Sequence, residues 1–142
     1  MAINQTVCTE FKTNVLKGVE NFDTGTPYVY KIALYDATAT LGADTLVYTT
    51  DGEVTGTGYT AGGEILTPSV PTSENGVAYV TFANVTWNPA SFTTRGALIY
   101  NSTTGAAVEV LNFGEDKTAS PVIGFTITFP PATSTTAIIR FT

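Results

Sequence analysis

The chain has 142 residues, of which 13% are charged, a formal net charge of −6, no histidine and one cysteine. This length suits one domain with a core of its own, and a charged fraction about half the usual value indicates a surface of uncharged polar groups. The acidic balance argues against nucleic acid and anionic membranes as partners, because both are bound by clusters of lysine and arginine. About one residue in five is threonine, whose branched side chain favours strands.

Groups that could carry chemistry are scarce. Without histidine or a second cysteine, the chain lacks the usual ligands for zinc, iron and copper, and Cys8 is expected to be a small buried apolar residue. No nucleophile motif occurs and nothing selects a pair of carboxylates for hydrolysis, so we predict no enzymatic activity and no cofactor. Calcium is the one metal left open, although the acids match no calcium loop and are better explained as solvated turns: Asp36, Asp44, Asp51 and Glu53.

The N-terminal segment, residues 1–20, is predicted to be an arm with the only helix. Residues 6–16 carry an apolar stripe at spacings of three and four, with Thr6 or Thr9 as the cap and Gly18 just past the end. The first residues lack the basic start and long apolar core of a signal peptide, so we expect synthesis in the cytosol. The helix packs on its own sheet or on a neighbouring subunit, and the former is favoured. The stripe consists of Val7, Cys8, Phe11 and Val15.

The next part of the chain begins with a strong strand at residues 28–35, where apolar residues alternate. Residues 46–49 form a short apolar patch. Residues 51–63 are rich in glycine and threonine, which predicts a long irregular loop, and we expect it to pack closely on a neighbouring subunit. Residues 64–70 contain Pro68, which limits this strand to an edge or to a short length.

The second half reads as strands separated by turns. Asn75-Gly76 is typical of a type I′ turn, and residues 102–105 join the clearest hairpin. Strands are predicted at residues 76–83 (continued by Val85 and Trp87), 94–101, 106–113, 122–129 and 137–141. Seven or eight strands in all predict an all-β fold, an antiparallel β-sandwich or jelly roll with one short N-terminal helix, in a single domain over residues 1–142.

Alternation along these strands also predicts the core. Most of the fully buried residues are expected among Ile32, Leu34, Val80, Phe82, Leu98, Tyr100, Leu111, Phe125 and Ile127.

Two groups of residues could form sites. The run GTGYTAGG, residues 56–63, resembles a phosphate-binding loop only in its glycines, since no helix or lysine follows as such a loop needs. The aromatic residues could line a sugar site, but alternation places most of them in the core. Trp87, at the end of a strand before Asn88-Pro89, is expected to be partly exposed and to contribute to a protein interface.

Nine segments then follow one another in a specific order along nearly the whole chain. They are VCTEFKTNVLKG (7–18), YKIALY (30–35), ATLGA (39–43), EVTGTGYTAGG (53–63), ANVTW (83–87), FTTRGALIYNS (92–102), LNFGEDK (111–117), TITFP (126–130) and AIIR (137–140). This ordered set resembles a family of small virion structural proteins of tailed bacteriophages. The resemblance implies a virion component without catalytic residues.

Within that family, a capsid decoration or cement protein is favoured by analogy. It would sit on the outer head surface, bind the major capsid protein and assemble as a homo-oligomer, most simply a trimer. Tyr59, Trp87 and Arg95 fall in the matching segments and are the candidate interface residues. The alternatives are a tail or neck protein of the adaptor or tube type, and a host-surface carbohydrate-binding module.

Overall fold

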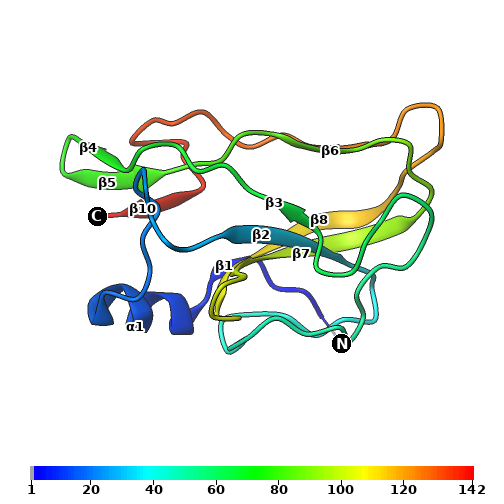
Figure 1. Ribbon diagram of the computed structural model, residues 1–142, viewed down its shortest axis with the longest axis horizontal. Helices are drawn as coiled ribbons and strands as arrows, with labels where there is room; N and C mark the ends of the chain where they lie inside the picture. The colour runs from blue at the N-terminus through cyan, green and yellow to red at the C-terminus, as the bar shows by residue number, and fades with distance from the viewer. Residues whose placement is uncertain (1) are drawn as a thin grey trace.

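The computed structural model describes residues 2–142, which form one helix and ten strands (Figure 1). The helix α1 spans Thr9–Lys17. The strands are β1 (Thr6–Val7), β2 (Tyr30–Tyr35), β3 (Glu64–Ile65), β4 (Thr72–Glu74), β5 (Val77–Val80), β6 (Val85–Trp87), β7 (Thr93–Asn101), β8 (Ala107–Thr118), β9 (Phe125–Ile127) and β10 (Ile139–Phe141). All the strands pair antiparallel, so the predicted all-β class with one short helix is confirmed.

A five-stranded sheet of order β1-β8-β7-β2-β3 forms the centre of the molecule. The predicted hairpin supplies the two longest strands of this sheet. Its strands β7 and β8 pair from Thr93↔Thr118 to Tyr100↔Ala107, with two register irregularities. Residues of β2 are buried on both faces of this sheet, with Lys31 the partial exception. One face belongs to the main core and the other is covered by the N-terminal segment and residues 39–48, which explains why simple alternation describes β2 poorly.

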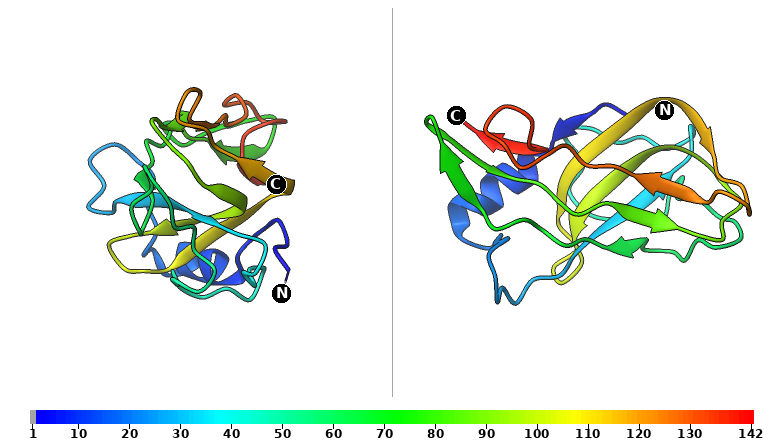
Figure 2. Two further views of the ribbon diagram at one scale, coloured as in Figure 1. Left: turned by 90° about the vertical axis from the view of Figure 1, so that its right-hand side faces the viewer. Right: turned by 90° about the horizontal axis from the view of Figure 1, so that it is seen from above.

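A second layer covers the main-core face. It consists of a three-stranded sheet of order β10-β5-β4 and the pair β6-β9, and the views in Figure 2 show it lying across the central sheet. Val80, Trp87 and Ile139 from this layer join the same apolar cluster as Ile32 and Leu34 from β2. The arrangement is a β-sandwich-like packing of two layers around one core.

The helix begins later than predicted. Thr6 and Val7 form β1, which pairs with β8, so the cap position falls on Cys8, whose side chain makes no capping hydrogen bond. The end is as predicted, because Gly18 takes the left-handed conformation (φ 75°) and its N–H donates to a helix carbonyl. Phe11 and Cys8 are buried against their own domain, whereas Val15 is exposed.

Several strands differ in extent. Residues 46–49 form no strand, and the strand predicted over 64–70 shrinks to the two residues of β3 at the sheet edge. Beyond it the chain leaves this sheet, because the Ser69 N–H donates to the Thr81 carbonyl and Pro68 forms a bridge with Phe82. The strand predicted over 122–129 begins only at Phe125. Asn75 (φ 53°) and Gly76 (φ 81°) form the predicted tight turn, but the strand before it, β4, was not predicted because its residues TSE are polar and exposed.

The predicted core is confirmed at every position except Phe125, which is only half-buried at the edge of the aromatic cluster. Cys8 is fully buried, as predicted, and burial followed by the nearby Glu109 carboxylate raises the pKa of its thiol to about 12. Among residues 2–142, no helix has the length and apolarity needed to cross a membrane.

Candidate functional site

The glycine-rich loop, residues 51–63, packs onto its own domain. Gly63 (φ 78°) lies against the backbone of β2, where a Cβ would collide with the carbonyl oxygen of Ile32. Gly58 (φ 85°) lies equally close to the carbonyl of Pro89. These glycines are therefore required for close approach within the chain, while the outward threonines remain exposed.

One buried carboxylate holds this loop in place. Glu53 Oε1 accepts hydrogen bonds from the Tyr59 hydroxyl and the Gly62 N–H, both at 2.7 Å, and Oε2 accepts from the Tyr48 hydroxyl at 2.5 Å. Tyr59 in turn accepts the Leu34 N–H at 2.9 Å, which ties the loop to β2. Because the Glu53 carboxylate already accepts the Gly62 N–H, this backbone donor is not free to bind a phosphate.

The tyrosines of this network are poor acids. Burial, then the hydrogen bond to Glu53, raises the pKa of Tyr59 well above its usual range, and the same causes raise the pKa of Tyr48. Burial raises the pKa of Tyr100 to about 12, and its hydroxyl donates to the Gly62 carbonyl at 2.7 Å. These hydroxyls serve as hydrogen-bond donors, so the network is a structural clamp.

The three candidate interface residues lie in different environments. Trp87 is only 2% exposed, which corrects the expectation of partial exposure. Its ring packs between those of Tyr59, Phe92 and Phe125, and Tyr59 is itself half-buried. Val85 and Trp87 share one face of β6, and this alternation was the signal for burial. Arg95 also remains partly exposed, with a side chain 37% exposed that lies 3.7 Å from Asp116.

The acids considered for calcium do not converge. Within residues 2–142, no three histidine, cysteine, aspartate or glutamate side chains form a group that could hold a metal. The Asp36 carboxylate accepts from the backbone N–H and the hydroxyl of Thr38, which is the pattern of a solvated turn.

A second buried carboxylate lies between apolar residues of β8. Glu109 is 5% exposed, its Oε2 atom has no hydrogen-bond partner, and burial raises its pKa to about 8. It faces the start of α1 near Cys8. The sequence signal was a single acid inside the apolar run Ala107–Leu111.

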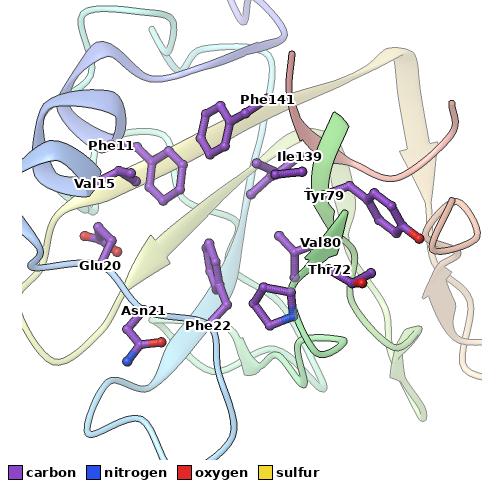
Figure 3. A pocket seen from close by; sticks show the side chains of 12 residues that line it. Phe11, Val15, Glu20, Asn21, Phe22, Thr72, Tyr79, Val80, Ile139 and Phe141 are labelled. Carbon is purple, nitrogen blue, oxygen red and sulfur yellow. The ribbon is translucent and has the colours of Figure 1, made fainter. Parts of the chain in front are cut away.

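An apolar pocket, defined here by α1, residues 20–22, β4, β5 and β10, encloses about 230 Å³ (Figure 3). The rings of Phe11 and Phe141 stack with centroids 6.2 Å apart along one wall, and Phe22 lies beneath. Glu20 is the only carboxylate among the lining residues: its Oε2 accepts from the Tyr30 hydroxyl at 2.8 Å, while its buried Oε1 has no partner. Burial raises the pKa of Glu20. Sequence reasoning missed this pocket because it joins three distant segments.

An apolar turn, residues 121–124 between β8 and β9, exposes apolar side chains on the surface instead of lining a pocket. Val122 is 89% exposed and Ile123 is 79% exposed, which corrects their assignment to a strand. The turn is held at its base because the Gly124 N–H donates to the Ser120 carbonyl at 2.7 Å. No charged residue occurs from residue 118 to residue 139.

Comparison with protein-family models, with curated proteins and with solved structures finds no match for the chain.

Proposed function

We propose that this chain is a virion structural protein of a tailed bacteriophage, of the capsid decoration or cement type. The proposal starts from the ordered set of segments that resembles this family. It also takes the sandwich-like fold to be of the jelly-roll type, with no catalytic role.

The observation that favours an assembly subunit is the distribution of exposed apolar side chains. A chain with only 13% charged residues exposes large apolar groups in several separate regions: Leu16 on α1, Ile65 and Val70 near β3, Leu46 and Val47 in a loop, and Val122 and Ile123 in the apolar turn. Scattered single apolar residues are ordinary on a protein surface, but paired ones at loop tips suit contacts with other proteins. A subunit with several such contacts can touch several neighbours at once.

The mechanism we propose is linkage between binding and shell stability. A protein that binds only the assembled shell, through many modest contacts, stabilises that shell against disruption. Each contact with the major capsid protein can be weak, because repetition over the shell multiplies the effect. The surface of the domain is held in one conformation at its longest loop, because Glu53 accepts hydrogen bonds from Tyr59 and Gly62. Arg95 is the candidate residue for a polar contact at such an interface.

Thermal disruption of particles tests this function. Particles that lack the protein should assemble but release their DNA at a lower temperature than complete particles. Adding the purified wild-type protein should restore the higher temperature, and adding the core-disrupted Trp87→Ala variant should not. Equal disruption temperatures with and without the protein would contradict a decoration role.

A further inference from the structure

We propose that the apolar pocket binds a small organic cation whose ammonium nitrogen carries methyl groups in place of protons. The aromatic wall of the pocket surrounds the methyl groups, and the Glu20 carboxylate balances the charge. This inference assigns a ligand site and goes beyond the proposed function, on which it does not depend.

Three phenylalanines from separate parts of the chain line the pocket: Phe11 from α1, Phe22 from the segment that follows it, and Phe141 from β10. The centroid of the Phe11 ring lies 5.7 Å from that of Phe22 and 6.2 Å from that of Phe141. Figure 3 shows the rings of Phe11 and Phe141 face-on and that of Phe22 nearly edge-on. The negative face of an aromatic ring attracts an ammonium group within about 6 Å of its centroid, and more strongly where water is excluded. Several rings around one pocket therefore favour a cation that tolerates an apolar surface.

Glu20 is a half-buried carboxylate that has no cationic partner in the chain. Its Oε2 accepts from two uncharged groups, the Tyr30 hydroxyl at 2.8 Å and the Asn101 side-chain amide at 3.4 Å. Neither ion pair found among residues 2–142 includes Glu20. Burial raises its pKa, and the nearby charge that also raises it comes from another acid, Glu10. A positive charge held in the pocket stabilises the ionised form of this carboxylate.

The pocket suits a methylated ammonium better than a primary one. A primary ammonium carries three N–H donors and is strongly hydrated, so it needs several acceptors when it leaves water. The walls are mainly apolar, and the free oxygen of Glu20, Oε1, is itself buried. That oxygen attracts a positive charge but is not accessible to a hydrogen-bond donor in the pocket. A nitrogen covered by methyl groups keeps its charge and needs no acceptor.

The size of the pocket agrees with such a group. The pocket encloses about 230 Å³, and an apolar cavity of about 150 Å³ already holds benzene, which is similar in size to a trimethylammonium group. Val15 and Phe141 are each about two-fifths exposed, so the pocket opens to solvent between α1 and β10. A small cation can therefore enter without unfolding the domain.

The surrounding charges favour a cation that carries no anion of its own. Acids outnumber bases on the segments that form the pocket, which are α1, residues 20–23, β4, β5 and β10. The charged residues of these segments are Glu10, Glu20, Asp23 and Glu74 against Lys12, Lys17 and Arg140. The Arg140 guanidinium donates to the Thr135 carbonyl. The phosphate of a phosphocholine head group would meet the acids, whereas free choline brings a positive charge alone.

Titrations of the full chain followed in two-dimensional amide NMR spectra test the site. Choline is the probe, and three compounds change one property each. Dimethylbutanol replaces the ammonium nitrogen by carbon and removes the charge, ethanolamine keeps the charge and lacks the methyl groups, and phosphocholine adds an anion.

Two variants test the two parts of the site. Glu20→Gln removes the charge and keeps the size of the side chain, and Phe141→Leu removes a ring but leaves the wall apolar. Glu64→Gln is the matched control, because it changes the net charge equally at an exposed acid that does not line the pocket. Circular dichroism and thermal unfolding check that each variant folds as the wild type does.

We expect choline to bind with a dissociation constant on the order of 1 mM and to shift amide signals at residues 20–22, 78–80 and 139–141. Dimethylbutanol, ethanolamine and phosphocholine should each bind at least about tenfold more weakly. Glu20→Gln should weaken choline binding roughly tenfold and Phe141→Leu about threefold or more, whereas Glu64→Gln should leave it unchanged.

Dimethylbutanol that binds as tightly as choline would overturn the inference, since the pocket would then select only for apolar surface. Ethanolamine that binds equally well would overturn it by showing that charge alone attracts the ligand, and equal or tighter binding of phosphocholine would contradict a free cation. Choline shifts that spread over the acidic surface without saturation, or that persist in Glu20→Gln, would do the same. None of these results bears on the virion role, which particle disruption and copy number test separately.

Discussion

The loop at residues 51–63 and the apolar turn at residues 121–124 show opposite uses of an irregular segment. The longer loop turns its carboxylate and its aromatic residue inward, where Glu53 and Tyr59 bind each other and the sheet. In the shorter turn the Gly124 N–H donates to the Ser120 carbonyl, and the side chains of Val122 and Ile123 remain in solvent. Glycine content and length therefore do not distinguish a loop that packs on its own domain from one that leaves its apolar side chains in solvent. The direction of the apolar side chains does.

The largest effect should come from the core beneath the loop. Trp87→Ala removes a nearly fully buried ring that packs against Tyr59, and we expect it to lower the free energy of unfolding by about 3–5 kcal/mol. Urea denaturation measures this change. The matched truncation in the apolar turn, Ile123→Ala, should change it by less than about 0.5 kcal/mol. Equal losses from the two variants would mean that the turn also belongs to the folded core.

The Glu53 clamp should come next. Glu53→Gln replaces a carboxylate oxygen that serves buried donors, and we expect a loss of about 1–3 kcal/mol in the free energy of unfolding. Hydrogen exchange at the Gly62 amide should accelerate in the same variant. Asp51→Asn, at an exposed acid of the same loop, is the control and should leave both measurements unchanged. Unaltered protection at Gly62 in Glu53→Gln would show that glycine packing alone holds the loop.

Glu109 shows by contrast with Glu53 what hydrogen-bond donors contribute, because it is a buried carboxylate whose Oε2 atom has no donor. Its folded pKa of about 8 lies above the ordinary value of 4.5, so the folded protein keeps a proton that the unfolded chain releases. The free energy of unfolding should therefore fall as the pH rises from 4.5 to 8. Glu109→Gln should flatten this slope and be more stable than the wild type at pH 8 by about 1–2 kcal/mol. Denaturation of Glu109→Gln and of the exposed control Glu64→Gln across this pH range tests the prediction. The same pH dependence of the free energy of unfolding in both variants would contradict it.

The smallest change in stability should accompany Ile123→Ser, whose exposed side chain contributes nothing to the fold. We expect its melting temperature to match that of the wild type in dilute solution, where chains are separate. At high concentration the wild type alone should gain thermal stability, because association stabilises the folded state. Differential scanning calorimetry at two concentrations measures both effects. A concentration dependence that is the same in both proteins would remove the apolar turn from any interface.

Local patterns predicted the parts of the fold that local physics determines. The β7–β8 hairpin, the turn at Asn75-Gly76 and the helix end at Gly18 all follow from residue types at fixed spacings. The helix start was wrong because Thr6 and Val7 pair with a strand a hundred residues away. No helix pattern contains that information.

The surfaces were harder to predict than the core. Apolar alternation treated Ile123 and Phe125 as one strand face, although only the second packs against the aromatic cluster. The shared face of Val85 and Trp87 indicated burial, but only the pairing of β6 with β9 over the core shows that this face points inward. The apolar pocket needs Phe11, Val80 and Phe141 side by side, and only the folded chain brings them together.

The copy number of this protein in purified virions, measured by quantitative mass spectrometry against the major capsid protein, tests the proposed function most directly. Icosahedral heads repeat their parts by multiples of sixty, whereas necks and tails repeat them by six or twelve. We predict a copy number that is a multiple of sixty, as for a protein spread over the outer head surface. Six or twelve copies would contradict the decoration role and favour the neck or tail, and absence from the particle would contradict a virion function altogether.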